Sequence, residues 1–358
     1  MTFVIAEAGV NHNGSLDLAL QMIDLAAKAG ADAVKFQTFK AEKLVAAYTD
    51  MAAYQERQLG KKLTQLELLK ALELSPEAHS KMQAHCKRRN IEFMSTAFDS
   101  ESLTLLADDL KLGRFKISSG DMNNAPFVLQ HANLGKDMII STGMSTLDEI
   151  EQMLGVVAFG LTSRPQAEAS EAVFRDAYAS ETGRDALREK VTLLHCSTEY
   201  PVPLANINLA AMQLLAETFD VAVGYSDHST SLQVGGLAVA AAATVIEKHF
   251  TTDRSLPGPD HAASLTPEEL TSMIENIRFA EKVLGAKEKV PSEAEDNNAK
   301  VARKVICASQ DIKKGEVFSE QNLALLRSGE GVSPIRYWEY LSTKAARSYK
   351  KGDRIDAR

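Results

Sequence analysis

Hydrophobic positions along the chain follow two alternating periods. Short runs rich in β-branched and aromatic residues recur eight times, and each is typical of a buried strand. The runs are FVIAEA (3–8), AVKFQ (33–37), EFMSTAF (92–98), RFKISS (114–119), DMIISTG (137–143), VTLLHCS (191–197), VAVGYSD (221–227) and TVIEKHF (244–250). Between them lie segments with apolar residues every three or four positions, such as residues 15–31, which begin at a candidate N-cap, Ser15, and end near Gly30. This alternation predicts parallel strands joined by crossover helices, and eight such units within residues 1–285 favour a (β/α)8 barrel over a doubly wound sheet.

The periodicity changes near the end of the chain. Residues 286–300 lose the apolar repeat and are predicted to form a linker. Residues 301–358 begin with a short strand, a glycine-containing turn and a short amphipathic stretch, which indicates a separate small domain. We therefore expect a barrel domain over residues 1–285, a linker over 286–300 and a small domain over 301–358.

Two connections within the barrel are longer than the others. Residues 38–75 include a polar and aromatic segment, 47–60, which is a candidate cover for the barrel mouth. Residues 155–190 include a charged stretch that predicts a solvated helical insertion, and we expect this insertion to carry no chemistry.

Composition narrows the class of protein. Hydrophobic residues make up 45% of the chain and charged residues 25%, as in ordinary soluble globular proteins. The formal net charge of -8 argues against a nucleic-acid-binding protein, because phosphate backbones are bound by basic surfaces. The three cysteines form no CxxC pair, which favours free thiols in a reducing compartment. No run approaches the roughly 18 apolar residues of a membrane span, and residues 1–10 lack a basic leader, so we expect a cytoplasmic protein.

Polar residues are concentrated at the ends of the predicted strands. In a parallel barrel the carboxyl ends of all strands meet at one face, where the chemistry of such barrels takes place. The side chains at these ends, in chain order, are Glu7 and Asn11; Lys35 and Gln37; Ser95 and Thr96; Lys116, Ser118, Ser119 and Asp121; Ser141 and Thr142; His195 to Tyr200; Ser226, Asp227 and His228; and Glu247, Lys248 and His249. All eight strands therefore contribute to one candidate site.

Lys35 and Lys116 are lysines that lie inside apolar strands. Burying an uncompensated ammonium group is costly, so Lys35 and Lys116 each require an anionic partner. That partner is either a carboxylate of the chain, Glu7 or Glu247, or a bound phosphate or carboxylate. Neighbouring strand ends carry the hydroxyls and glycines from which phosphate cradles are built, in Ser119-Gly120 and Ser141-Thr142-Gly143. Together these features point to a phosphorylated or dianionic small substrate.

Two histidines end neighbouring strands. His228 and His249 should lie on the same rim of the barrel, where a pair of imidazoles suits a divalent transition metal with open positions for water and substrate. Each histidine taken alone is as well explained by ordinary hydrogen bonding, so the sequence leaves both interpretations open. The rigid Pro-Gly-Pro segment after the eighth strand places Asp260 either over the mouth, to bind a polyol, or at the start of the next helix as a cap.

These segments resemble the sialic acid synthases, which condense phosphoenolpyruvate with an N-acylated amino sugar. Nine motifs occur in the family's order: IAEAGVNHNGSLD, AVKFQTFKAEKL, MSTAFD, FKISSGDMNN, IISTGMSTLDEI, LLHCSTEYPVP, VGYSDHS, EKHF and PGPDHAAS. The part of the chain from about residue 301 resembles the C-terminal SAF domain of that family, which is similar to type III antifreeze proteins. The resemblance covers nearly the whole chain, and the bacterial N-acetylneuraminate synthases are the most similar members.

The resemblance implies a fold, a reaction and a set of site residues. The fold is a (β/α)8 TIM barrel followed by a small SAF domain. The reaction joins phosphoenolpyruvate, N-acetylmannosamine and water into N-acetylneuraminate and phosphate. It depends on a divalent metal, usually Mn²⁺, with Mg²⁺ or Co²⁺ as alternatives, and its ligands here are His228 and His249. Phosphoenolpyruvate is held by Lys35, Thr96, Lys116, Ser119, Ser141, Thr198 and Ser226, and the sugar by Gln37, Asp121, Tyr200, Asp260 and Arg327.

Further expectations concern catalysis and assembly. Glu7 is the candidate for acting on the attacking water or on opening of the sugar ring. Asp227 is expected to orient an imidazole. The family forms domain-swapped homodimers, in which an arginine of the partner's SAF domain reaches the sugar, and Arg327 occupies that position.

Three positions depart from the family's pattern. Asp121 replaces the usual glutamate, Arg327-Ser328-Gly329-Glu330-Gly331 replaces Arg-Pro-Gly-Asn-Gly, and an asparagine of the sixth strand is missing, with Ser197 or Thr198 as substitutes.

Other functions remain as alternatives. The first is a synthase of the same mechanism that acts on another sugar, such as the precursor of N,N'-diacetyllegionaminate. A metal-dependent aldolase or hydrolase barrel is the second, although the HxH of amidohydrolases is absent from the first strand. A sugar-binding or ice-binding protein without activity is suggested only by residues 301–358.

Overall fold

The computed structural model describes residues 1–46, 49, 64–163 and 168–358. The chain forms two compact units, Met1–Gly285 and Ala286–Arg358, which are described separately below. The predicted cover at residues 47–60 lies outside the described residues except for residue 49.

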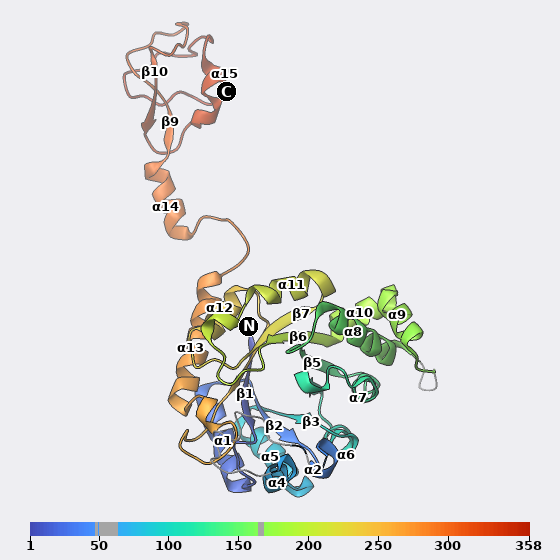
Figure 1. The fold of residues 1–358 in the computed structure, drawn as a ribbon. Helices are drawn as coiled ribbons and strands as arrows, with labels where there is room; N and C mark the ends of the chain where they lie inside the picture. Colours follow the sequence, from blue (N-terminus) through green and yellow to red (C-terminus); the bar gives the residue numbers. More distant parts are fainter. Residues whose placement is uncertain (47–48, 50–63, 164–167) are drawn as a thin grey trace. The chain divides into compact units, whose positions relative to one another are not determined.

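The first unit is a closed barrel of eight parallel strands in sequential order, with helices outside it (Figure 1). This confirms the predicted (β/α)8 architecture. The strands are β1 (Phe3–Gly9), β2 (Ala33–Thr38), β3 (Glu92–Ala97), β4 (Arg114–Ile117), β5 (Asp137–Ser141), β6 (Val191–Cys196), β7 (Ala222–Asp227) and β8 (Val245–His249).

The helices of this unit begin and end where local chemistry dictates. Helices α8 and α13 each begin with a capping box. The side chain of Thr146 or Thr266 accepts from the backbone N–H of the glutamate three residues later, and that glutamate's side chain accepts from the backbone N–H of the threonine. Helix α1 ends at Gly30, whose φ of 86° suits a residue without a side chain. The helices are α1 (Leu16–Ala29), α2 (Ala41–Leu44), α4 (Gln65–Leu72), α5 (Pro76–Arg89), α6 (Ser100–Thr104), α7 (Ala125–Ala132), α8 (Leu147–Thr162), α9 (Glu171–Ala179), α10 (Glu181–Lys190), α11 (Ala210–Phe219), α12 (Val234–Ala240) and α13 (Pro267–Leu284).

The interior of the barrel changes from apolar to polar along the strands. A buried apolar cluster fills its middle, consisting of Ile5, Ala33, Met94, Ile139, Leu194 and Val245. Side chains alternate between the two faces of a strand, so the residue two positions further on also points inward. At that level the eight strands carry Glu7, Lys35, Thr96, Lys116, Ser141, Cys196, Ser226 and Glu247, all of them buried. The period of two therefore converts eight separate strand ends into one inner ring, which we call the polar ring.

The predicted insertion is helical but packs more closely than expected. Helix α9 lies against α8, and the backbone of Phe174 is so near Gly155 that a Cβ there would lie 2.8 Å from the Phe174 carbonyl oxygen. Tyr178 and Leu187 are buried. The segment is therefore helical and largely exposed, as expected, and α9 and α10 each also bury a large side chain.

The second unit has its own small core. Strands β9 (Lys304–Ala308) and β10 (Leu323–Arg327) pair antiparallel, and α15 (Tyr337–Tyr340) follows them. Buried side chains including Ile306, Phe318 and Tyr349 form one apolar cluster. Within the predicted linker, α14 (Glu293–Ala302) begins at Ser292 and buries none of its residues. Among the described helices of both units, none is long and apolar enough to cross a membrane.

Candidate active site

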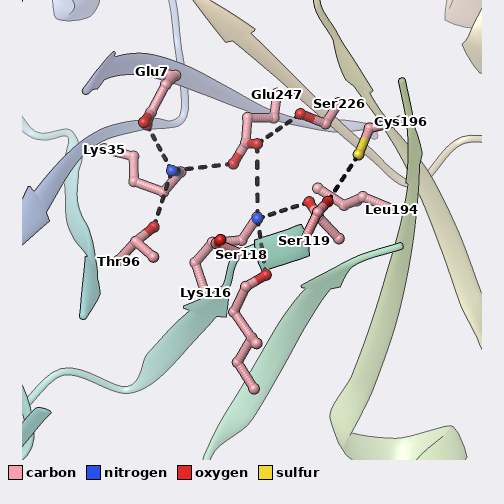
Figure 2. Close-up of polar contacts among 12 residues, drawn as sticks. Glu7, Lys35, Thr96, Lys116, Ser118, Ser119, Leu194, Cys196, Ser226 and Glu247 are labelled. Atoms are coloured by element: carbon pink, nitrogen blue, oxygen red, sulfur yellow. Dashed lines mark hydrogen bonds and ion pairs between the residues drawn. The ribbon is translucent and has the colours of Figure 1, made fainter. Parts of the chain in front are cut away.

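Lys35 occupies the centre of one half of the polar ring. Its Nζ lies 2.7 Å from Glu7 Oε2 and 3.4 Å from Glu247 Oε2, and it donates to Thr96 Oγ1 at 3.1 Å (Figure 2). The carboxylate partners that the sequence allowed are therefore present. Gln37 lies two residues after Lys35 on β2, and its side-chain amide donates to Glu7 Oε1 at 3.4 Å.

Lys116 occupies the other half of the ring. Its Nζ donates to Ser141 Oγ at 2.7 Å and lies 3.9 Å from Glu247 Oε1, so Glu247 stands between the two lysines (Figure 2). Glu247 also accepts a hydrogen bond from Ser226 Oγ at 2.8 Å. Sequence reasoning placed Glu247 at the end of its strand and named it as a possible ion-pair partner, but gave it no role with the substrates. Its inward position, two residues before His249, is the signal that would have placed it in the site.

Charge in the ring is set by burial and by the two lysines. Burial raises the pKa of Glu7 to about 7, although the neighbouring Lys35 opposes this shift. Burial would also raise the pKa of Glu247, but Lys116 and Lys35 together lower it to about 2. Burial lowers the pKa of Lys116. Near neutral pH, Glu247 is therefore ionised, whereas Glu7 is poised between its two forms.

Four small residues that follow or end β4, β5 and β6 border the ring, and we call them the cradle: Ser119, Gly143, Cys196 and Thr198. The backbone N–H of Gly143 donates to Ser119 Oγ at 3.0 Å, and Ser119 Oγ lies 3.1 Å from Cys196 Sγ. A Cβ at Gly143 would lie 2.8 Å from both Cys196 Sγ and Thr198 Cγ2, so this turn admits only glycine without rearrangement. Thr198 therefore belongs to the cradle, whereas the hydroxyl of Ser197 donates to the carbonyl oxygen of Asn206 at 3.0 Å.

His228 and His249 lie side by side as predicted, with ring centroids 5.6 Å apart. Nδ1 of His228 is 2.6 Å from the carbonyl oxygen of Ser197, which can only accept, so this nitrogen carries the proton and Nε2 keeps its lone pair. Nδ1 of His249 is buried without a hydrogen-bond partner among the described residues. Burial lowers the pKa of both imidazoles, and the neutral form that results is the one that binds metals.

The donor set fits a divalent metal only as an open site. Within the described parts of the chain, no three His, Cys, Asp or Glu side chains are grouped as metal ligands. Two neutral imidazoles with free lone pairs would leave most coordination positions for water and substrate oxygens. Tyr200 stacks on His228 at 4.2 Å between ring centroids and meets His249 edge-on at 5.9 Å, so it covers the same pair.

Among the described contacts, two of the predicted sugar-binding residues, Asp121 and Asp260, have no hydrogen bond to the polar ring, and a third, Arg327, lies in the second unit. Asp121 accepts from Asn124 at 3.3 Å, and burial raises its pKa. Asp260 is half-buried, and burial raises its pKa to about 6. Arg327 is exposed at the end of β10 in the second unit.

Asp227 does not contact an imidazole in the way we expected. Its side chain turns away from the polar ring and pairs with Lys248 at 2.8 Å. Any orienting effect of Asp227 on an imidazole would therefore act through the main chain, because residue 227 faces the outside of the barrel and its neighbours on either side do not.

A cavity of about 790 Å³ opens beside the cradle. Its lining includes Ser119 and Gly143 of the cradle and, from α8 and α9, Met153, Phe174 and Tyr178. The insertion therefore forms a wall next to the candidate site.

Comparison with known proteins agrees with this arrangement. Residues 22–289 match the NeuB family, and residues 303–357 match the SAF domain. The chain is 43% identical to the N,N'-diacetyllegionaminic acid synthase of Campylobacter jejuni, over 99% of this chain and 98% of that protein. It is 41% identical to the N,N'-diacetyllegionaminic acid synthase of Legionella pneumophila, over 98% and 92%. Among solved structures, the N-acetylneuraminic acid synthetase of Leptospira borgpetersenii aligns with a TM-score of 0.65 and 31% identity, over 83% of this chain and 90% of that one.

Proposed function

From the premise that this chain belongs to the NeuB family and carries a SAF domain, we propose that it is an N,N'-diacetyllegionaminate synthase. In this reaction phosphoenolpyruvate, a 2,4-diacetamido-trideoxy sugar and water give N,N'-diacetyllegionaminate and phosphate. The observation that carries the choice of sugar is the identity of 43% and 41% to two synthases of that name, against 31% to the N-acetylneuraminic acid synthetase. It favours the alternative product over N-acetylneuraminate, which the motifs led us to expect first.

The polar ring and the cradle suit phosphoenolpyruvate. This substrate carries a phosphate and a carboxylate, and Lys35 and Lys116 are the two cations of the ring. Lys116 donates hydrogen bonds to a hydroxyl and a carbonyl, and its carboxylate partner, Glu247, lies 3.9 Å away, so a bound anion would be a closer partner. Hydroxyl donors around the lysines are supplied by Thr96, Ser119, Ser141, Thr198 and Ser226.

His228 and His249 would hold a divalent metal, which we propose to be Mn²⁺. When bound, such an ion polarises a carbonyl oxygen and offsets the negative charge that develops on it. The chain's own contribution is to keep both imidazoles neutral by burial and to fix the tautomer of His228 through Ser197.

The chain's residues then act on the two carbon centres of the reaction. C3 of the enol attacks the sugar's aldehyde carbon, water adds at C2, and phosphate leaves, so every atom of water and of both substrates is accounted for. Lys35 and Lys116 fix the enol phosphate, and positioning of this kind removes much of a bimolecular barrier. Glu7, with its pKa of about 7, is suited to accept the proton of the attacking water at neutral pH.

The sugar would lie above the ring. Gln37 lies next to Glu7, and Tyr200 lies next to the two histidines. Asp121 and Asp260 follow β4 and β8 along the chain. We further propose that Arg327 of a partner subunit completes the sugar site in a domain-swapped homodimer.

Release of phosphate with a panel of sugars tests the proposal. The 2,4-diacetamido-trideoxy sugar should give a kcat/KM at least tenfold above that of N-acetylmannosamine, and chelation of divalent metal should abolish both rates until Mn²⁺ is restored. His228→Ala should not recover with Mn²⁺. A preference for N-acetylmannosamine would make the chain an N-acetylneuraminate synthase, and phosphate release with neither sugar would contradict the function itself.

A further inference from the structure

A buried ion pair lies behind the two histidines, on the outer face of the strands that carry them. Lys248 Nζ is 2.8 Å from Asp227 Oδ2, and the two side chains are 1% and 0% exposed. Asp227 directly precedes His228, and Lys248 directly precedes His249. The two residues are also register partners on β7 and β8.

The pair holds the chain on both sides of His228. Lys248 Nζ donates to the carbonyl oxygen of Ser229 as well as to Asp227, and the backbone N–H of Ser229 donates to Asp227 Oδ1 at 2.8 Å. Residues 227 and 229 are thus tied to one ammonium group on the neighbouring strand. The main chain of His228, which lies between them, has little freedom to move relative to β8.

Stability alone does not account for this pair. Removing two charges from water costs about as much as their attraction returns, and apolar residues of similar size commonly replace buried pairs without loss. In some proteins a buried pair fixes the relation between two segments, because any displacement leaves a charge without its partner. Here the two segments are those that present the imidazoles.

We propose that Asp227 and Lys248 are positioning residues that set the spacing of His228 and His249 for a shared divalent metal. The proposal rests on the metal site of the proposed function. Contacts to the ring and carbonyl of His228 then complete its orientation: Nδ1 is held by the Ser197 carbonyl oxygen, and the His228 carbonyl oxygen accepts from the Val202 N–H at 3.0 Å. The ion pair fixes the position of the main chain at His228, and the two hydrogen bonds fix the orientation of its imidazole ring.

Mn²⁺ binding to the metal-free protein separates positioning from stability. We would measure the dissociation constant from the electron paramagnetic resonance signal of free Mn²⁺, without substrates, together with the Tm of each metal-free variant. The variants are Lys248→Met and the double variant Asp227→Asn, Lys248→Met, which removes the pair without leaving a buried charge. Arg278→Met is the matched control, because it breaks the Arg278–Asp32 pair at the opposite ends of the strands.

Both variants at the pair should raise the Mn²⁺ dissociation constant by about tenfold or more, as loss of contacts behind metal-binding histidines does. Excess Mn²⁺ should restore most of kcat while the KM for phosphoenolpyruvate stays unchanged. Arg278→Met should lower the Tm and leave Mn²⁺ binding as in the wild type. If Lys248→Met fails to fold, the double variant and Lys248→Arg, which keeps the charge and should bind nearly as the wild type does, decide the question.

Two results would overturn the inference, and they differ from each other. Wild-type affinity in the folded double variant, with or without a lower Tm, would show that the pair does not position the ligands and would leave the proposed function intact. Absence of Mn²⁺ binding in the wild-type protein would overturn the metal step of the proposed function and the positioning role with it.

Discussion

Glu7 and Glu247 are the same residue type in the same ring, yet their environments move their pKa values in opposite directions. Glu247 stands between two lysines and accepts from Ser226, which lowers its pKa to about 2. Glu7 has one close lysine and is otherwise desolvated, which raises its pKa to about 7. Carboxylates whose pKa values are separated in this way commonly divide the roles of permanent charge and proton carrier. This difference supports our proposal that Glu7 is the proton carrier of this ring.

This difference predicts a pH dependence. If the carboxylate of Glu7 accepts the proton of water, kcat/KM should rise with pH and level off above an apparent pKa of about 7, because kcat/KM reports the free enzyme. The pH profile of phosphate release at low substrate concentration checks this. Glu7→Gln should be slow and should lose the rising limb, whereas Glu7→Asp should keep one. A rising limb that persists in Glu7→Gln would assign it to another group.

At the scale of elements, the turn after β5 controls the cradle. A Cβ at Gly143 would lie 2.9 Å from Ser119 Oγ and still nearer to two other side chains, and real Cβ atoms essentially never approach so closely. Its φ lies outside the left-handed region, so the obstacle to a larger residue is space and not backbone strain.

Gly143→Ala should therefore displace Ser119 and weaken phosphoenolpyruvate binding. We expect its KM to rise about tenfold, equivalent to about 1.4 kcal/mol of binding free energy, with a smaller change in the KM for the sugar. Gly113→Ala is the matched control, because no atom lies within 4 Å of a Cβ at that position. An unchanged KM in Gly143→Ala would mean that the cradle does not bind this substrate.

At the scale of the whole molecule, we expect the second unit to contribute to binding of the sugar and not to binding of phosphoenolpyruvate. Deletion of residues 301–358 should raise the KM for the sugar far more than the KM for phosphoenolpyruvate, because the polar ring lies wholly in the first unit. Steady-state kinetics with each substrate varied in turn would show the difference. Arg327→Ala in the full chain should reproduce it, and equal effects on both KM values would count against a role for Arg327 at the sugar.

Overall stability should fall in mild acid. His131 is buried between α7 and β4, its Nδ1 donates to the Phe127 carbonyl oxygen, and burial lowers its pKa to about 4. The unfolded chain takes up the proton near pH 6.5, so stability that is fully present above that pH is lost as the pH falls toward 4.

At pH 5 the loss from His131 alone is about 2 kcal/mol relative to neutral pH. His12 and His261 also have pKa values of about 4 and add losses of the same sign. Glu7 and Asp260 act in the opposite direction, because their raised pKa values of about 7 and about 6 let the folded chain take up protons before the unfolded chain does. Urea unfolding at pH 7 and pH 5 would measure the total, and His131→Leu should show a smaller difference between the two than the wild type. An equal difference in His131→Leu would contradict this account.

Much of the fold and part of the site followed from local pattern. Eight apolar runs separated by helical periods led to the barrel, and the alternation of side chains placed Lys35, Lys116 and His249 on its inner face. These are properties of neighbouring residues, since a period of two or of 3.6 depends only on local backbone geometry. The packed insertion and the pairing of Asp227 with Lys248 were missed because both depend on contacts between distant segments.

The sequence by itself determined the class of barrel, the level along each strand at which polar residues begin, and which residue types stand there. Only the tertiary structure decided their partners: Glu247 between two lysines, Gly143 against Ser119, and Lys248 against Asp227. The physical reason is closure of the barrel. The distance between side chains on different strands depends on how eight strands tilt and stagger as the sheet closes, and no single segment specifies that geometry.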